Sequence, residues 1–396
     1  MVSSWIEGIV LIYFVYVVSY TFLFSFGAHF YRLPTRVKGK NNRFGVLIPA
    51  YKEDNVILSV AQAALRQSYD HAHYRVVIIA DSLQPKTIEQ LKTLPIDVVE
   101  VVFESSTKVK ALNAALKAIG DNFDYAVVLD ADNVMALDFL TIVNEVHNSG
   151  VRAVQGQRVP KNLNSPMSFL DGLSEAINNH VYRQGSTALG LSASISGSGV
   201  SFEYRTFKEL LSGMTSLGGF DRELEILLQE RGTKVVYCKN AKVLDEKVEK
   251  TKVFENQRKR WIYSQYFYLA KYFRRGCMAL LKGNVSYFNS AVFRNIQLPR
   301  LINLGLLTLI VFLLYFLRDY LFFGYLIWPL LFATMIISML ISIPREYYSR
   351  KLIKALLRLP EMFLRMFLLL FRLGEANKKF IHTPHGSPTD QPGTTK

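Results

Sequence analysis

The sequence predicts an α/β protein built on a mostly parallel, doubly wound sheet, with long apolar segments on both sides of that domain. Two observations support this class. Between residues 43 and 160, short apolar runs alternate with stretches of helical periodicity, and strands that alternate with helices form parallel sheets. Near both ends of the chain, uncharged stretches are long enough to cross a bilayer.

Residues 1–32 are predicted to form a membrane anchor. No charged residue occurs between Glu7 and Arg32, and the run lacks the basic start and the small-residue cleavage site of a signal peptide. Five basic residues follow it: Arg32, Arg36, Lys38, Lys40 and Arg43. Basic flanks stay on the cytoplasmic side of membranes, so we expect the N-terminus outside and the next domain in the cytoplasm.

Four strands are expected after the anchor, at 43–50, 74–82, 96–103 and 125–132, with helices at 56–67, 87–94 and 109–119. Ligands bind at the carboxyl ends of such strands. Those ends carry Pro49, Ala50, Tyr51, Asp81, Ser82, Asp130 and Asp132. Neither a dinucleotide fingerprint nor a P-loop follows any strand, which argues against both of those nucleotide sites.

The pair Asp130 and Asp132 directly follows an apolar strand. Two such carboxylates suit Mg²⁺ or Mn²⁺, which binds a few carboxylates together with substrate phosphates. A polar strand end that caps the next helix is the alternative. Asp81 alone is also compatible with an ordinary turn or N-cap residue.

A glycine turn opens the segment 217–237, which continues as an amphipathic helix carrying Asp221, Glu223 and Glu225 near its start. Acidic residues are common at helix N-termini for electrostatic reasons. A carboxylate placed there near a substrate hydroxyl also has the position of a general base. The residues alone do not decide between the two interpretations.

Two further apolar runs, 301–317 and 321–343, predict a transmembrane hairpin with a tight turn at Arg318–Asp319, and a buried soluble hairpin is the alternative. Basic residues follow the second run, which again indicates the cytoplasmic side. Charges at helical spacing and Pro360 interrupt the segment 352–373. It is expected to be an amphipathic helix in the membrane interface, with a fourth span as the alternative. The tail from 385 to 396 is expected to be disordered.

A strongly basic segment, ENQRKRW, occupies residues 255–261 in a chain of formal net charge +15, with 47 Lys+Arg against 32 Asp+Glu. Such an excess predicts an anionic partner: nucleic acid, lipid headgroups or a phosphorylated substrate. Because the segment directly precedes aromatic-rich basic sequence and the apolar hairpin, we expect no nucleic-acid partner. The two cysteines, Cys238 and Cys277, support neither a disulfide framework nor a four-ligand zinc site.

Taken in order, the pieces IPAYKED, ADS, KVKALNAAL, LDAD, SGSG, GGFDREL and QRKRW resemble membrane-integrated family 2 glycosyltransferases of the cellulose, chitin and hyaluronan synthase kind. The resemblance covers residues 43–265 and implies a GT-A-type fold with cytoplasmic interfacial helices and about three transmembrane helices. It divides the chain into a transmembrane anchor, a glycosyltransferase domain, interfacial helices, a transmembrane hairpin, an amphipathic helix with a TP segment, and a tail. These are 1–32, 33–245, 246–300, 301–343, 344–384 and 385–396.

The resemblance also implies roles for individual residues. Asp81 would contact the uridine of a UDP-sugar, Asp130 would lie near the donor, Asp132 would hold Mg²⁺ or Mn²⁺, and Asp221 would be the catalytic base, with Glu223 as its alternative. The other residues assigned to the donor nucleotide are Pro49, Ala50, Tyr51, Glu53 and Lys108. The sequence departs from the family at Phe220, where an acidic residue usually precedes the base.

For ENQRKRW, the resemblance places Gln257 and Arg260 on the donor pyrophosphate and Trp261 on the acceptor sugar. Arg258 and Lys259 are expected to be solvated or to contact lipid headgroups. The acceptor side would further include Gly197, Ser198, Gly199 and Gln157, with Gln155 on the same strand. His382 and His385, near the TP segment, are expected to have no ligand role.

The activity implied is inverting transfer from a UDP-sugar to a growing β-linked polysaccharide at the inner face of the plasma membrane, with translocation of the product. Single transfer to a lipid-linked acceptor and a non-catalytic polymer-binding subunit are the alternatives. A homo-oligomer or accessory secretion subunits are compatible with either activity.

Overall fold

A computed structural model describes residues 2–215 and 218–373 of the protein. The chain forms two compact units. The sheet unit contains residues 33–162 and 194–247, and the helical unit contains residues 2–32, 163–193 and 248–373. Segment 163–193, which the sequence includes in a continuous 33–245 domain, folds within the helical unit. The expected TP segment and disordered tail lie outside the described residues.

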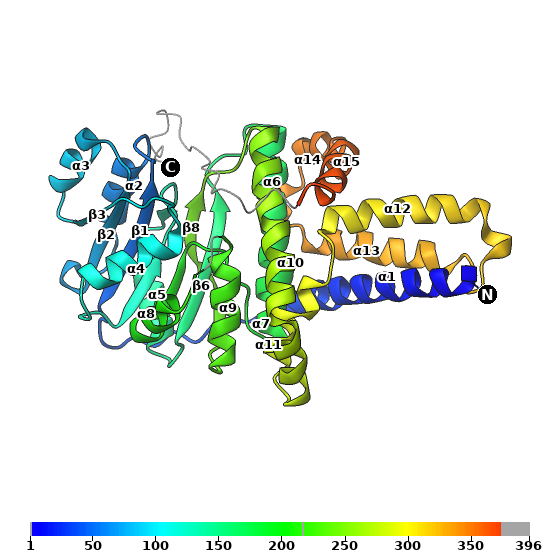
Figure 1. The fold of residues 1–396 in the computed structure, drawn as a ribbon, viewed down its shortest axis with the longest axis horizontal. Coiled ribbons are helices and arrows are strands. Elements are labelled where there is room, and N and C mark those ends of the chain that lie inside the picture. Colours follow the sequence, from blue (N-terminus) through cyan, green and yellow to red (C-terminus); the bar gives the residue numbers. More distant parts are fainter. Residues whose placement is uncertain (1, 216–217, 374–396) are drawn as a thin grey trace. The chain divides into compact units, whose positions relative to one another are not determined.

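An eight-stranded sheet in the order β3-β2-β1-β4-β7-β6-β8-β5 forms the centre of the sheet unit (Figure 1). Its strands are β1 Phe44–Tyr51, β2 Tyr74–Asp81, β3 Asp97–Val101, β4 Tyr125–Val128, β5 Val134–Met135, β6 Ala153–Pro160, β7 Val200–Glu203 and β8 Val235–Asp245. The four strands that the sequence predicts, β1 to β4, are mutually parallel. The sheet is mixed, because β7 runs antiparallel to β4 and β6, and β5 to β8. It is still mostly parallel, as the sequence predicts, because β6 and β8 pair in parallel and run in the same direction as β1 to β4.

Helices cover both faces of the sheet, because successive side chains of each strand point to opposite faces. On β1, Phe44, Val46, Ile48 and Ala50 are fully buried and belong to one core cluster with residues of α2 and α5. Since successive side chains of a strand point to opposite faces, α4 and α8, which contact each other and the strands, cover the other face. The helices of this unit are α2 Ile57–Ala64, α3 Pro85–Lys92, α4 Lys108–Ala118, α5 Phe139–His147, α8 Tyr204–Ser212 and α9 Phe220–Glu230.

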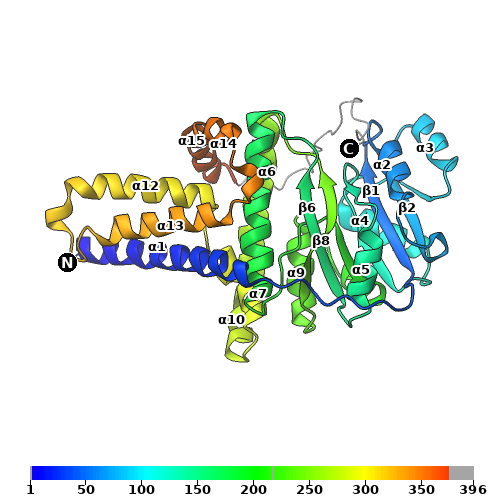
Figure 2. The same cartoon turned by 180° about the vertical axis from the view of Figure 1, so that it is seen from behind.

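Apolar helices form the core of the helical unit. Its helices are α1 Val2–Gly27, α6 Pro166–Asn178, α7 Ser186–Ala188, α10 Thr251–Leu281, α11 Val285–Ala291, α12 Arg300–Phe316, α13 Ile327–Ser342, α14 Arg350–Leu356 and α15 Leu359–Leu370. Helices α1, α12 and α13 lie side by side in both views (Figures 1 and 2) and share a cluster that includes Phe14, Leu307 and Trp328. Helix α6 continues into a π-helical segment, Asn179–Gly185.

The connection between α12 and α13 is longer than the tight turn that the sequence predicts, because α13 begins only at Ile327. After a short 3₁₀ turn, Arg318–Tyr320, the chain leaves helical geometry. The Glu7 carboxylate of α1 accepts hydrogen bonds from the backbone N–H groups of Phe322 (2.9 Å) and Phe323 (3.2 Å). This contact satisfies backbone donors that a continuous helix would otherwise use.

By length and composition, one described helix, residues 4–30, is long and apolar enough to cross a bilayer alone. Segment 285–295 and α12 satisfy the same criterion only as a pair bent by 57°, and α13 is apolar but shorter. The amphipathic segment after α13 is two helices, α14 and α15. They are separated at Leu357 and Arg358, directly before Pro360 in the first turn of α15.

Candidate functional site

The carboxyl ends of the parallel strands meet at one edge of the sheet, as the sequence predicts. In the register of the sheet, Tyr51 at the end of β1 lies beside Asp81 at the end of β2. The residue after each strand end, Lys52 (φ 55°) or Ser82 (φ 58°), has left-handed backbone geometry although neither is glycine. Strained residues of this kind cluster at binding sites, so this edge is where we place the candidate site.

Asp81 is a buried carboxylate at this edge, 2% exposed. It accepts hydrogen bonds from the hydroxyls of Ser82 (3.0 Å) and Ser106 (3.1 Å). Burial raises the pKa of Asp81, and the two serine hydroxyls and the Lys52 ammonium partly offset that effect. The carboxylate is thus held in a fixed position by its neighbours.

The other residues at the end of β1 that are expected around the donor nucleotide differ from one another in burial. Pro49 and Tyr51 are half-buried, whereas Glu53 is buried, and its backbone carbonyl accepts the N–H of Ile57 at the start of α2. Ala50 is completely buried in the core. A ligand at this edge would therefore meet the backbone of Ala50 rather than its side chain.

Lys108 joins three parts of the site. It is the first residue of α4, which Thr107 caps by accepting the N–H of Lys110. Its ammonium forms an ion pair with Asp130 and donates to the carbonyl of Gly197 (2.8 Å). It also lies 4.9 Å from the centre of the Phe220 ring. The aromatic residue in place of the usual acid thus contacts this cation.

The Asp130–Asp132 turn begins where β4 ends at Val128. The backbone N–H of Asp130 donates to the Ser198 hydroxyl (3.0 Å), and the N–H of Asn133 donates to the Asp130 carbonyl (3.1 Å), which closes the turn. The Asp132 carboxylate is buried and accepts from the Asn133 amide (3.0 Å). These bonds explain why the strand is shorter than its apolar sequence predicts.

Mg²⁺ or Mn²⁺ fits these carboxylates only as a partial site. Within residues 2–215 and 218–373, no three His, Cys, Asp or Glu side chains converge as a complete metal site. Mg²⁺ is commonly held by one or two carboxylates together with substrate phosphates. Asp130 and Asp132 match that donor set, with the remaining ligands coming from a bound diphosphate.

The loop 196–199 lies against this turn, and the Gln155 side chain forms hydrogen bonds with the backbone of the loop. Its amide donates to the carbonyls of Ser198 (3.0 Å) and Gly199 (3.2 Å) and accepts from the N–H of Ser196 (3.0 Å). Gly199 has φ +63°, and a Cβ there would come within 2.8 Å of Val243. Gln155 is completely buried, so its observed role is to support the loop.

Gln157 lies at a bulge, where the register between β6 and β8 shifts after Gly156. The residue is half-buried, and its Oε1 atom is buried and accepts no hydrogen bond. Bulges often re-aim side chains next to functional sites. Gln157 therefore carries a buried acceptor atom without a hydrogen bond beside the bulge.

Asp221 lies in the first turn of α9, after Gly219, whose φ of +66° lets the chain enter the helix. It faces the loop, because a Cβ on Gly197 would lie 3.7 Å from Asp221 Oδ2. Burial raises the pKa of Asp221, although Arg222 and Lys108 act in the opposite direction. A carboxylate with a raised pKa beside an open loop has the properties of a general base.

The two other acids near the start of α9 differ from Asp221 in exposure. Glu223 is buried at 2% exposure, and Glu225 is buried at 1%. Glu225 accepts the backbone N–H of Ile195 (3.1 Å), which ties the helix to the loop. Asp221 is the most accessible of the three, so it is the best placed to meet a substrate.

Arg258 corrects one expectation about the basic segment, which lies on α10 of the helical unit. It is not a solvated charge. It forms an ion pair of 2.6 Å with Asp171 of α6, and the two side chains are 11% and 9% exposed. The guanidinium also lies 4.6 Å from the Phe254 ring and 4.3 Å from the Trp261 ring. The pairing with α6 explains the burial, since an unpaired charge is costly to bury.

The residues that flank Arg258 have different surroundings. Gln257 and Arg260 are half-buried, and burial lowers the pKa of Arg260. The Gln257 Oε1 atom is buried and accepts no hydrogen bond. Trp261 is 37% exposed, and Lys259 is half-buried rather than fully solvated. The segment thus combines one structural arginine with polar groups that can meet a ligand.

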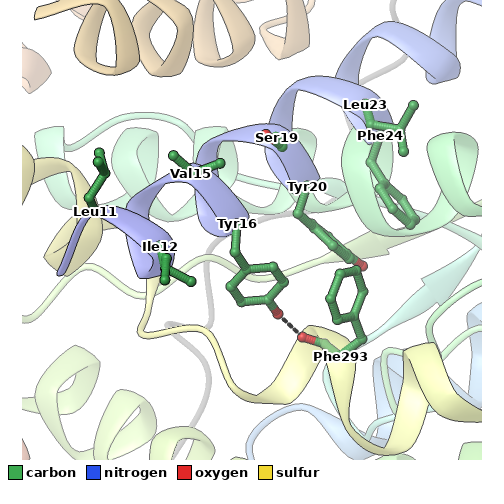
Figure 3. Close-up of a pocket in the computed structure, with 9 residues that line it drawn as sticks. All are labelled: Leu11, Ile12, Val15, Tyr16, Ser19, Tyr20, Leu23, Phe24 and Phe293. Atoms are coloured by element: carbon green, nitrogen blue, oxygen red, sulfur yellow. Dashed lines mark hydrogen bonds between the residues drawn. The ribbon is translucent and has the colours of Figure 1, made fainter. Parts of the chain in front are cut away.

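An apolar groove of about 490 Å³ runs along α1 (Figure 3). Its lining is Leu11, Ile12, Val15, Tyr16, Ser19, Tyr20, Leu23, Phe24 and Phe293. The Tyr16 hydroxyl donates to the Phe293 carbonyl, as the close-up shows. None of the expected site residues lines this groove, and its chemistry suits a hydrocarbon chain better than a nucleotide.

Several polar residues of the site were missed from the sequence. Asn133 bridges Asp132, Ser198 and Asp245, and Arg158 and Lys247 each bond to the buried Asp245 carboxylate at 2.5 Å. These two cations lower the pKa of Asp245. The only available signal was position, because Asn133 directly follows the paired acids and Asp245 ends an apolar run.

A protein-family model described as "Glycosyltransferase like family 2" matches residues 41–264, which is more than half of the chain. No curated protein sequence matches the chain. A solved mannosyltransferase, PcManGT from Pyrobaculum calidifontis in complex with GDP-Man and Mn²⁺, is 15% identical with a TM-score of 0.56. The match covers 93% of this chain and 97% of that chain.

A second solved structure, S. aureus TarS 1–349 in complex with UDP-GlcNAc, is 13% identical with a TM-score of 0.39, covering 52% of this chain and 59% of that chain. Because this TM-score is low, the match to TarS supports no conclusion about this chain. The likeness to PcManGT shows a GT-A-like α/β fold with a mixed sheet.

Proposed function

Because this chain belongs to glycosyltransferase like family 2, we propose that it transfers a sugar from a UDP-sugar, with inversion, to a growing β-linked polysaccharide. The observation that carries the proposal is the convergence of Lys108, Asp130, Gly197 and Asp221 at the carboxyl edge of the sheet. A cation, a paired carboxylate turn and a candidate base there supply the groups that a single displacement needs.

The reaction follows from these groups. Asp221 takes the proton from an acceptor hydroxyl, and the acceptor oxygen forms a bond to the anomeric carbon as the bond to the UDP oxygen breaks. The electron pair of the broken bond leaves on the diphosphate, and no covalent enzyme intermediate is needed. Lys108 lies beside Asp130, where its charge can stabilise the diphosphate.

Asp130 and Asp132 would hold Mg²⁺ or Mn²⁺, which when bound neutralises the leaving diphosphate. Asp81, with Pro49, Ala50, Tyr51 and Glu53, would hold the nucleoside. Support comes from the fixed geometry of the buried Asp81 carboxylate at the same edge. The structure of the mannosyltransferase PcManGT contains Mn²⁺ together with GDP-Man, which agrees with metal dependence.

On the helical unit, Gln257 and Arg260 are proposed to contact the diphosphate, and Trp261 the acceptor sugar. The acceptor side of the sheet unit would be the loop Gly197, Ser198 and Gly199 together with Gln157. The buried Oε1 atoms of Gln157 and Gln257, which accept no hydrogen bond, support these assignments. Arg258 is given no ligand role in this proposal, because Asp171 pairs with it.

We propose that α1, α12 and α13 insert into the plasma or inner membrane, with the sheet unit in the cytoplasm. Large apolar side chains are exposed on all three helices, including Ile9, Phe312 and Leu330. Soluble proteins rarely expose continuous apolar surfaces of this kind. Basic residues follow the apolar segments at 32–43 and 345–354, which favours the cytoplasmic side for those flanks.

A single transfer to a lipid-linked acceptor is the second candidate, and the apolar groove along α1 favours it. Its lining would suit the hydrocarbon tail of such an acceptor. The paired acids and the buried, fixed polar groups around them argue against a subunit that only binds polymer.

Purified full-length protein in detergent, given a panel of UDP-sugars, tests the proposal. Release of UDP with one donor, and polymer on gel analysis, is the expected result. A single sugar added to an extracted lipid would favour the second candidate. No nucleotide release with any nucleotide sugar would refute both.

A further inference from the structure

We propose that Asn133 is a positioning residue, which orients the Asp132 carboxylate toward the diphosphate and its metal ion and couples that carboxylate to the acceptor-side loop. The inference rests on the proposed function. Asn133 was not singled out by the sequence pattern, and it is a neutral amide with no direct part in the displacement.

The side chain of Asn133 is completely buried and makes three hydrogen bonds to different elements. Its amide N–H₂ donates to Asp132 Oδ1 (3.0 Å) and to Asp245 Oδ1 at the end of β8 (3.1 Å). Its carbonyl oxygen accepts from the Ser198 hydroxyl (2.7 Å). Each donor hydrogen and the acceptor thus has its own partner, so the amide cannot rotate without breaking a buried bond.

The partners of Asn133 are themselves fixed. Asp245 is buried and bonded by Arg158 and Lys247, both at 2.5 Å. The charge of Asp245 is therefore already balanced, and Asp245 acts as an anchor for the amide. Ser198 also accepts the backbone N–H of Asp130 (3.0 Å), so the loop and the acidic turn are connected twice.

These hydrogen bonds allow Asn133 to fix the orientation of the Asp132 carboxylate. The Asn133 amide holds one oxygen of the Asp132 carboxylate and thereby restricts the rotation of the carboxylate plane. Groups that orient metal ligands in this way typically change metal affinity or activity by about 10–100-fold when removed. The same amide contacts Ser198, next to Gly197, which faces Asp221. Donor and acceptor sides therefore share one side chain.

Asn144 offers a matched control in the same unit. It is also buried, at 4% exposure, and accepts from the backbone N–H (3.1 Å) and the side-chain amide (2.7 Å) of Asn42. It lies on α5, and its side-chain hydrogen bonds go to Asn42 and to the Lys40 carbonyl. Loss of either asparagine removes a buried hydrogen-bond network, but only Asn133 contacts the acidic turn.

The test is the dissociation constant of Mn²⁺ in the presence of saturating UDP, measured by electron paramagnetic resonance on the full-length protein. We expect about 10–100-fold weaker Mn²⁺ binding in Asn133→Ala, with UDP binding in EDTA unchanged. Asn144→Ala should lower the thermal midpoint to a similar extent and leave the Mn²⁺ constant at the wild-type value. Ser198→Ala, which removes one hydroxyl, should shift the Mn²⁺ constant in the same direction by a smaller factor. If Asn133→Ala does not fold, Ser198→Ala replaces it as the test variant.

Unchanged Mn²⁺ binding in Asn133→Ala, or in Ser198→Ala where it replaces that variant, overturns the inference alone. An equal loss of Mn²⁺ binding in Asn144→Ala also overturns it, because general destabilisation would then explain the effect. A wild-type protein that binds no Mn²⁺ with UDP overturns the metal part of the proposed function and this inference with it.

Discussion

The two units use buried charge differently. In the sheet unit, charged side chains converge at strand ends, where Lys108, Asp130 and Asp221 remain partly accessible. In the helical unit, Arg258 with Asp171 and Arg183 with Glu175 are buried pairs between or within helices. The difference indicates that the accessible charges of the first unit serve chemistry, whereas its buried Asp245 group and much of the charge in the second unit serve packing. Substitutions in each unit should therefore fail in different ways.

Asp221→Asn should have the largest effect on activity. A general base typically contributes about 10²–10⁴-fold to rate, so sugar transfer should fall by that factor while UDP affinity stays within a few-fold of wild type. Steady-state rates and UDP inhibition measure the two effects. Glu223→Gln is the control. Near-normal turnover in Asp221→Asn together with loss of activity in Glu223→Gln would show that Glu223, not Asp221, is the base.

Removal of divalent metal should reduce the rate of sugar transfer by a similar factor. Neutralising a leaving diphosphate is worth several kcal/mol, so excess EDTA should reduce transfer by roughly a hundredfold or more. Added Mg²⁺ or Mn²⁺ should restore it. Full activity in EDTA would show that Asp130 and Asp132 only shape the turn.

Arg258→Ala should mainly affect the stability of the helical unit. Breaking a buried ion pair by removing one partner costs about 3–5 kcal/mol, so the thermal midpoint of the protein in detergent should fall clearly. Asp171→Ala should show a comparable loss. If both variants keep the wild-type midpoint, the contrast drawn between the units is wrong.

Arg260→Ala and Trp261→Ala should separate two functions of the helical unit. Loss of a hydrogen bond to a charged group costs about 1.5–3 kcal/mol, so Arg260→Ala should reduce transfer roughly ten- to hundredfold and weaken UDP inhibition. Trp261→Ala should leave UDP affinity unchanged and shorten the products. Lys259→Ala should change neither property. Equal damage by Lys259→Ala and Arg260→Ala would remove the diphosphate role from Arg260.

The pH dependence of Asp221 should give the smallest effect. Its pKa is raised in the folded protein, so above that pKa the ionised carboxylate opposes folding, and the penalty disappears below the pKa of the unfolded chain. Asp221→Asn should therefore melt at a slightly higher temperature than wild type at neutral pH, with the gap closing as the pH falls. The rate of wild type should fall over the same acidic range. A variant that melts lower at neutral pH would contradict the raised pKa.

The sequence predicted the parts of the sheet unit that depend on local pattern. Parallel strands β1 to β4, the strand-end position of Asp81 and the turn at Asp130 follow from apolar periodicity and from the residue types at the ends. Apolar periodicity can show that a segment is a strand but not which way it runs in the sheet, and β7, Val200–Glu203, is only four residues long. The reversed direction of β5 and β7 was missed for that reason.

What the sequence did not predict depends on contacts between distant segments. Asp171 and Arg258 are 87 residues apart, and Asn133 and Asp245 are 112 residues apart. Arg258 was expected to be solvated or to contact lipid headgroups, and nothing in the local sequence points to Asp171. The folding of 163–193 into the helical unit likewise follows from long-range packing, where Phe169 and Leu173 contact Tyr20 and Phe24 in one cluster.

The anomeric configuration of the first transferred sugar tests the central claim most directly. One displacement by an oxygen that Asp221 deprotonates inverts the anomeric carbon, so an α-linked UDP-sugar should give a β-linked product in the proton NMR spectrum. A product with retained α configuration would contradict the single displacement and the role assigned to Asp221.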